Sequence, residues 1–225
     1  MGGIVNAVSR SGSNEFEFGG YLRVDPEATR EHHDNLLNTD GSLFNNTAQD
    51  ESTFTRYNIW ASGALIEDSL FFYALYEPQK SDYIAAGRTT LDDGETTSDR
   101  YFGKLDWYIN DNHSVEFTTI GFTTKGKGTT YLNDWETQQR GEATGNYSSR
   151  TGGDVYGLKY TGILNDEMSV EFIAGRTTDK TYNTAESSDP SVWSNLTGSW
   201  AQVSTHTNST VTESEFIRDQ YCRRL

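Results

Sequence analysis

The sequence is poor in the cysteines that stabilise small secreted domains, and it lacks the long apolar runs that form transmembrane helices. It contains one cysteine, Cys222, and three prolines in 225 residues. A single cysteine excludes an internal disulfide framework and a zinc site built from cysteines. No run of about 18 apolar residues is present, so no transmembrane helix is predicted. The first residues show no basic patch followed by an apolar stretch, so no signal peptide is predicted either.

Basic side chains are also scarce. The chain carries 18 lysines and arginines against 33 acidic residues, for a formal net charge of −15. Nucleic acid is therefore not an expected partner, because phosphate contacts need clustered positive charge. Hydrophobic residues make up 34% of the chain and the mean hydropathy is −0.71, which fits neither a dense soluble core nor a disordered tail. Aromatic residues nevertheless reach 13%, so the fold must combine large wet surfaces with many aromatic side chains.

Most of the chain shows the period-two alternation of β-strands. From Phe16 to Val24, for example, apolar residues or glycine alternate with more polar ones such as Glu17 and Arg23, which is the pattern of a strand with one wet face. No stretch keeps a helical period over three turns. The alternation therefore predicts an all-β protein, with regular strands at 16–24, 57–65, 104–109, 158–161 and 170–175, and less regular ones at 70–82 and 114–125.

The connections between these strands alternate between short and long. A compact soluble domain rarely carries even one structureless loop of about 20 residues. An outer-membrane barrel has tight turns at one end, long loops at the other and strands of about 9–11 residues between them. The fold class predicted is therefore an antiparallel, up-and-down transmembrane β-barrel. Its tight turns are predicted at 67–69, 110–113 and 165–167, and its long external loops at about 25–52, 83–100, 126–153 and 181–213.

Charged residues within the strands are expected to point into a wet lumen. On a lipid-facing side near mid-bilayer, an arginine or lysine would cost about 2–4 kcal/mol. One strand face must therefore be free of charge and the other must collect it. The residues predicted to face the lumen are Glu17, Arg23, Arg56, Lys104, Asp106, Glu116, Lys159, Glu171 and Arg176.

Four blocks of the sequence resemble a known family. Residues 2–16 (GGIVNAVSRSGSNEF) are similar to the stretch that ends the plug and enters the barrel in TonB-dependent receptors, most of all in the Oar-like subgroup. Residues 57–76 (YNIWASGALIEDSLFFYALY), 104–117 (KLDWYINDNHSVEF) and 156–172 (YGLKYTGILNDEMSVEF) resemble strand–turn–strand units of that family. The resemblance extends over about residues 2–180, and the long loops take no part in it.

The resemblance implies a Gram-negative outer-membrane receptor that imports an external ligand when the TonB energy-transducing complex displaces its plug. Such a receptor has a 22-stranded barrel, so the chain is expected to be a fragment: residues 1–15 end the plug, and residues 16–225 form the first seven or eight barrel strands. A sheet of about seven strands cannot close, and its edges would stay unpaired in lipid. The expected partners are TonB, whose contact region is not in this chain, outer-membrane lipid, and an unknown small-molecule, glycan or peptide ligand.

Two sets of residues are candidates for function. The plug–barrel segment is expected to move or loosen when TonB pulls, and it comprises Gly2, Gly3, Ile4, Val5 and Asn6. Three loop tryptophans, Trp135, Trp193 and Trp200, could stack on a sugar ring, a siderophore catechol or a peptide. Packing between loops, or an aromatic girdle at the membrane interface, explains these tryptophans at least as well. Five strand aromatics are interpreted as girdle or lumen residues: Trp60, Tyr73, Tyr76, Trp107 and Tyr108.

No enzyme, metal site or cofactor is predicted. The sequence has no Gly-x-Ser-x-Gly nucleophile elbow, and the adjacent His32 and His33 would point apart on most backbones. A different class of protein remains open, namely a secreted, soluble β-rich adhesin or carbohydrate-binding module. That alternative predicts a packed core on one strand face and no lipid-facing belt, and it predicts a chain that is soluble without detergent.

Overall fold

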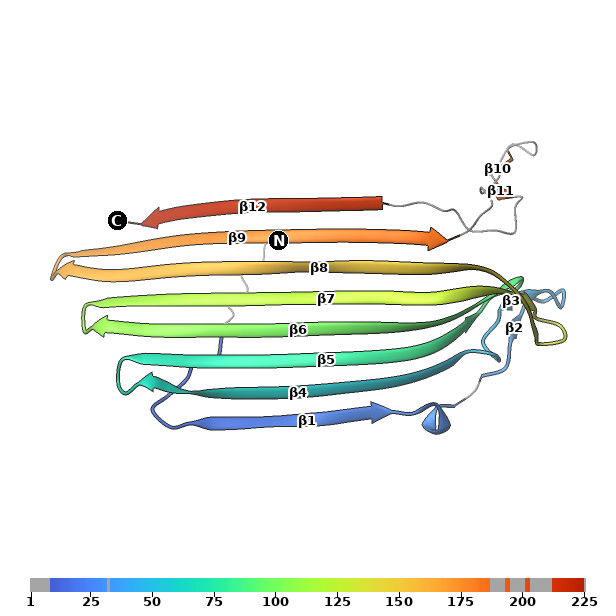
Figure 1. Ribbon diagram of the computed structural model, residues 1–225, viewed down its shortest axis with the longest axis horizontal. Coiled ribbons are helices and arrows are strands. Elements are labelled where there is room, and N and C mark those ends of the chain that lie inside the picture. The colour runs from blue at the N-terminus through green and yellow to red at the C-terminus, as the bar shows by residue number, and fades with distance from the viewer. Residues whose placement is uncertain (1–8, 32, 187–192, 195–200, 203–211, 225) are drawn as a thin grey trace.

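One antiparallel sheet of eight long strands makes up the computed structural model, which describes residues 9–31, 33–186, 193–194, 201–202 and 212–224 (Figure 1). The strand order is β1-β4-β5-β6-β7-β8-β9-β12, so neighbours in the sheet follow one another along the chain apart from short elements in two connections. The predicted all-β, up-and-down architecture is confirmed. The strands are β1 Glu17–Asp25, β4 Glu51–Ile66, β5 Leu70–Ala86, β6 Thr90–Asn110, β7 His113–Asp134, β8 Gln139–Asn165, β9 Met168–Glu186 and β12 Thr212–Arg224.

The two ends of the sheet differ. At one end, three tight turns join β4 to β5, β6 to β7 and β8 to β9, as predicted; we call this the short-turn end. The short elements gather at the opposite, long-connection end (Figure 1). They are the 3₁₀ helix η1 Glu27–Thr29, β2 Leu36–Leu37 and β3 Leu43–Asn45 in the first connection, and β10 Trp193–Ser194 and β11 Ala201–Gln202 in the last.

In the part of the chain that the structure describes, no helix has the length and apolar character needed to cross a membrane.

Two of the four predicted long loops are wrong. The segments 83–100 and 126–153 belong almost entirely to strands, because β5 and β6 are joined by residues 87–89 alone, and β7 and β8 by residues 135–138. Strands β6, β7 and β8 are 21, 22 and 27 residues long, about twice the expected length. Their distal halves carry mostly polar residues and glycine on both faces, so no apolar alternation reveals them. Cross-strand pairing still forms there, as between Asp93 and Thr129.

The other two predicted loops agree with the structure to different extents. The loop predicted at 25–52 corresponds to the connection of residues 26–50 between β1 and β4. The loop predicted at 181–213 is wrong at its start, because β9 continues to Glu186. Of the residues that follow before β12, only β10 and β11 lie within the described part.

The first connection is fixed to the long-connection end by two asparagines. The side-chain amides of Asn46 and Asn133 donate to the carbonyl of Gly87, at 2.9 and 3.0 Å, and each also donates to Oε1 of Gln49 at 3.0 Å. Both asparagines are buried. This cluster ties the end of the first connection to the β5–β6 turn and to the end of β7.

A tyrosine bridges the distal halves of β5 and β8. The hydroxyls of Tyr147 and Tyr83 are 2.8 Å apart, and burial raises the pKa of Tyr147 above its ordinary value. The Tyr147 ring crosses β7 at Gly128, where a Cβ atom would lie 2.6 Å from Tyr147 Cζ and 2.7 Å from the Asp93 carbonyl oxygen. Glycine at position 128 therefore makes room for the bridge.

Replacing Gly128 with alanine should destabilise the sheet. An added methyl group has no space, and overpacking typically costs about 1–3 kcal/mol. The measurement is the free energy of unfolding by urea in detergent. Gly157→Ala is the matched control, because the nearest atom to a Cβ there is 3.9 Å away, and this variant should be neutral or slightly stabilising. Equal effects of the two substitutions would contradict the tyrosine bridge.

Register divides the side chains between two faces. Residues paired across strands share a face, and successive residues along a strand alternate. Ser62, Tyr73, Lys104 and Thr118 are paired in turn across β4 to β7, and we call their side the inner face and the opposite side the outer face. Eight of the nine predicted lumen charges share the inner face: Glu17, Arg23, Arg56, Lys104, Asp106, Glu116, Lys159 and Glu171.

Arg176 is the exception, and its prediction as a lumen-facing residue is wrong. It pairs with Tyr156 and follows Phe172 by four residues along β9, so it lies on the outer face. Arg176 occupies the same hydrogen-bonded row as Phe18 of β1. The apolar part of the outer face thus ends nearer the short-turn end on β9 than on β1. Strands that are tilted in a membrane require such a stagger.

The outer face carries a continuous apolar band next to the short-turn end. Most of its large side chains are exposed and the rest are half-buried; Phe18 and Leu65, for example, are 77% and 59% exposed. We call these residues the apolar band. They are Phe18, Leu22 and Val24 of β1, Ile59 and Leu65 of β4, Leu70, Phe72 and Tyr76 of β5, Tyr101, Leu105 and Trp107 of β6, Val115 and Phe117 of β7, Tyr156, Leu158 and Tyr160 of β8, and Val170 and Phe172 of β9.

Candidate functional site

Residues 9–13, which precede β1, lie against the inner face of β4 and β5. The chain approaches the sheet most closely at Gly12. A Cβ atom there would collide with the carbonyl oxygen of Phe72 and would lie 2.8 Å from that of Gly63. The backbone of this segment therefore rests directly on the strand backbones, and only glycine allows that contact.

Arg10 fixes the start of the segment to two aromatic rings and a carboxylate. Its guanidinium carbon lies 4.2 Å from the ring centre of Trp60 and 5.7 Å from that of Tyr73. Its Nη2 donates to Glu17 Oε2 at 2.9 Å. Trp60 and Tyr73 stack on each other with ring centres 6.1 Å apart. Each cation–π contact of this kind contributes about 0.5–1 kcal/mol at an exposed site.

A buried lysine holds the middle of the segment. Lys104 Nζ donates to Ser11 Oγ at 2.9 Å and forms ion pairs with Asp106 at 3.2 Å and Glu116 at 3.0 Å. Lys104 and Asp106 are only 6% and 7% exposed. A buried cation needs such compensation, because removal from water costs several kcal/mol per ion. Asp106 Oδ2 has no hydrogen-bond partner among the described residues, so the charge of Asp106 depends on Lys104.

The end of the segment is clamped to the first tight turn. Asn14 Nδ2 donates to Asp68 Oδ1 at 2.6 Å, and the backbone N–H of Asp68 donates to Asn14 Oδ1 at 2.9 Å. Asp68 has a φ of 57°, a left-handed conformation that aspartate tolerates better than most residues. Beyond this clamp β1 begins beside β4, with Glu17 opposite Ser62.

Residues 10–14 together with Trp60, Asp68, Tyr73 and Lys104 form what we call the inner-face anchor. Its parts are hydrogen bonds, ion pairs and a stacked cation, and they can attach a preceding segment to the sheet. Sequence reasoning placed Lys104 on the wet face but gave no role to Arg10, Ser11 or Asn14. Their partners lie on β4 to β6, too far along the chain for any short motif to show the contact.

The predicted site residues are placed as follows. Gly2, Gly3, Ile4, Val5 and Asn6 lie outside the described residues, and so does Trp200. Trp135 is half-buried in the turn between β7 and β8, and Trp193 lies in β10 opposite Gln202. A shared ligand site for the three tryptophans therefore stays a prediction. Of the five strand aromatics, Trp60, Tyr73 and Tyr108 lie on the inner face and Tyr76 and Trp107 on the outer face.

The chain has a detectable relative among known proteins. Over 212 residues it is 27% identical to a protein named "TonB-dependent transporter Oar" from Myxococcus xanthus, an alignment that covers 80% of this chain and 19% of that protein. This weak similarity supports a relationship to the TonB-dependent receptor family. The chain spans about a fifth of the length of that relative, and the activity, ligand and partners of a whole protein are therefore proposals. No protein-family model and no solved structure matches the chain.

Proposed function

We propose that the chain is part of an Oar-like, TonB-dependent receptor of a Gram-negative outer membrane, which imports an external ligand. In this proposal the sheet is a stretch of the transmembrane barrel wall, with the apolar band against lipid and the inner face toward the lumen. The segregation of the two faces carries the proposal. Near the short-turn end, strand charges collect on the inner face, whereas the outer face at the same level is apolar and largely exposed.

The same segregation argues against the soluble adhesin. A soluble sheet protein would cover its apolar face with a second layer. Among the described residues only two hydrophobic side chains, Tyr73 and Leu91, are buried. None of the large apolar residues of the apolar band is buried and most are exposed, which suits lipid as the missing layer.

The inner-face anchor is the proposed attachment of the plug to the wall. Residues 1–15 would be the end of the plug, as the family resemblance implies. The clamp between Asn14 and Asp68 would stay fixed, because it continues directly into β1. The contacts of Arg10 and Ser11 are individually weak, and they would yield first when TonB pulls on the residues before them. The external ligand is proposed to be captured at the long-connection end, where Trp135 and Trp193 are candidate contacts; Trp200 is a third candidate from the sequence alone.

Tryptophan quenching by lipid tests the proposed membrane orientation. Trp107 lies in the apolar band and Trp60 lies on the inner face. Two variants, one that keeps only Trp107 and one that keeps only Trp60, are refolded into vesicles of brominated phosphatidylcholine. We expect the bromine to quench the fluorescence of Trp107 strongly and that of Trp60 weakly. The other tryptophans are replaced by phenylalanine in both variants. Equal quenching of the two, or quenching of neither, would overturn the lipid-facing role of the outer face.

A further inference from the structure

Basic residues gather on the outer face of β7, β8 and β9, directly beyond the apolar band. Between the band and the level of Lys127, this part of the outer face carries a single acidic residue, Asp154. In a chain with 33 acidic and 18 basic residues, such a gathering is unexpected. Arg176 and Lys180 lie opposite Asp219 and Glu215 of β12, so the excess of positive charge is centred on Lys125 and Arg150 of β7 and β8. We call the basic residues the cationic patch; they are Lys125, Lys127, Arg150, Arg176 and Lys180.

The two central members of the patch are left without neutralising partners. Lys125 and Arg150 are directly opposite each other on β7 and β8, an arrangement in which like charges destabilise a sheet. Neither side chain makes a hydrogen bond or ion pair with any residue that the structure describes. By contrast, Lys127 pairs with Glu95 at 2.8 Å. Two adjacent cations that repel each other point to an anion supplied from outside the chain.

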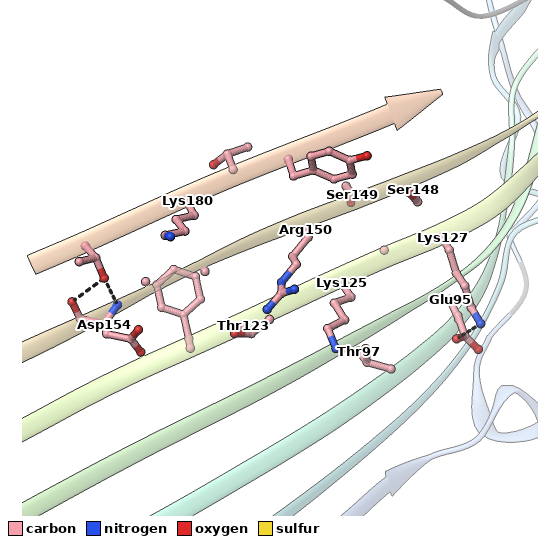
Figure 2. A pocket seen from close by; sticks show the side chains of 17 residues that line it. Glu95, Thr97, Thr123, Lys125, Lys127, Ser148, Ser149, Arg150, Asp154 and Lys180 are labelled. Atoms are coloured by element: carbon pink, nitrogen blue, oxygen red, sulfur yellow. Dashed lines mark hydrogen bonds and ion pairs between the residues drawn. The ribbon is translucent and has the colours of Figure 1, made fainter. Parts of the chain in front are cut away.

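The patch surrounds a hollow rather than a flat surface. A depression of about 830 Å³ is lined by four of its five members, and Figure 2 shows Lys125, Lys127, Arg150 and Lys180 around it. On the side toward the apolar band lies Asp154, whose carboxylate is already occupied by the Tyr101 hydroxyl at 2.6 Å. Tyr101 and Tyr156 belong to the band itself. The hollow and the band therefore form one continuous surface, cationic at one end and apolar at the other.

We propose that the cationic patch binds the phosphate headgroup of an anionic lipid whose acyl chains lie along the apolar band. The proposal rests on the membrane orientation of the proposed function. A guanidinium and an ammonium side by side match the oxygens of a phosphate group, and basic residues next to a bilayer surface attract anionic lipids. A soluble anion would match the charge of the patch but not its continuity with the band.

The test compares two lipids in one bilayer. The reporter is Tyr156→Trp in a background with the natural tryptophans replaced by phenylalanine, and Tyr101→Trp is a second reporter should the first fail to fold. Vesicles contain phosphatidylcholine with a minor fraction of phosphatidic acid, and bromine is carried either by the acid or by an equal amount of phosphatidylcholine. We expect brominated phosphatidic acid to quench several-fold more, because each cation contributes roughly fivefold to the local lipid preference.

Charge variants identify the side chains responsible. The double variant Lys125→Gln/Arg150→Gln should abolish the preference for phosphatidic acid. Arg23→Gln/Lys159→Gln removes the same charge from the inner face, and it should leave the preference intact. Equal effects of the two double variants would overturn the patch as the source of the preference.

Two further outcomes separate this inference from the proposed function. Strong but equal quenching by both lipids would overturn the lipid site and leave the membrane orientation standing, whereas quenching by neither would overturn both. Millimolar inorganic phosphate is the last arm of the experiment. If it erases the preference, the patch binds a soluble anion and the lipid assignment is wrong.

Discussion

Replacing Lys104 with alanine is expected to lower the free energy of unfolding by about 3–5 kcal/mol, the usual cost of breaking a buried ion pair by removing one partner. Among the residues that the structure describes, Lys104 is the only ion-pair partner of the buried Asp106, and it also pairs with Glu116 and donates to Ser11. Without the ammonium group, two carboxylates face each other on the inner face with no cation between them. Urea unfolding in detergent, followed by tryptophan fluorescence, gives the free energy directly.

Two variants make this result specific. Lys159→Ala removes a lysine from the same face, but Lys159 and its partner Glu171 are 43% and 30% exposed, so this variant should cost only about 0.2–1 kcal/mol. Adding Asp106→Asn to Lys104→Ala should recover part of the lost stability, because the stranded charge is then gone. A small effect of Lys104→Ala, or no recovery in the double variant, would show that the Lys104 cluster is not a compensated buried charge.

Alternation in the sequence revealed the strands only where the two faces of the sheet differ in polarity. Between Phe16 and Val24 one face is apolar and the other polar, so the period of two is visible. In the distal part of β6, from Thr90 to Arg100, every residue on either face except Leu91 is polar, charged or glycine. Neither face there has a regular apolar pattern, and the strand is maintained by backbone pairing with β5 and β7. Such pairing leaves no mark in the pattern of one segment, which explains why this stretch was predicted as a loop.

The inner-face anchor was beyond sequence reasoning for a related reason. The contact between Asn14 and Asp68 spans 54 residues, and that between Ser11 and Lys104 spans 93. Alternation predicts which face a residue occupies, and it correctly put Lys104 on the wet side. It contains no information about which strand a preceding segment crosses. That information arises only when the sheet brings β4, β5 and β6 side by side.

The two faces treat their cations differently. On the inner face Lys104 is surrounded by two carboxylates and a hydroxyl, so its charge is neutralised within the chain. On the outer face Lys125 and Arg150 repel each other across a strand pair. An acidic residue opposite either of them would have neutralised its charge, as Glu95 does for Lys127. The charge of Lys104 is compensated within the described part of the chain and the charges of Lys125 and Arg150 are not, which indicates different roles. The first fits attachment within the protein, and the second fits a partner outside it.

Replacing Gly12 with valine should release residues 9–13 from the inner face. The new side chain would collide with the carbonyl oxygens of Phe72 and Gly63, which belong to strand backbones that cannot move aside. The segment must lift instead, and Arg10 then leaves the Trp60 ring. Overpacking of about 1–3 kcal/mol corresponds to a rise of roughly fivefold to 150-fold in the lifted population. Limited trypsinolysis after Arg10 should accelerate by the same factor.

Ser13→Val is the matched control for this prediction, because it adds a similar side chain to the same segment at an exposed position. Within the described part of the chain, the Ser13 side chain forms hydrogen bonds with the backbone of Glu15 alone. It should be cleaved at the rate of the unaltered chain. A variant that keeps only Trp60 offers a second readout, since loss of the Arg10 guanidinium at 4.2 Å should change its emission in Gly12→Val alone. Equal cleavage of all three proteins would mean that close backbone contact at Gly12 does not hold the segment. The attachment would then depend on Asn14 and the first tight turn.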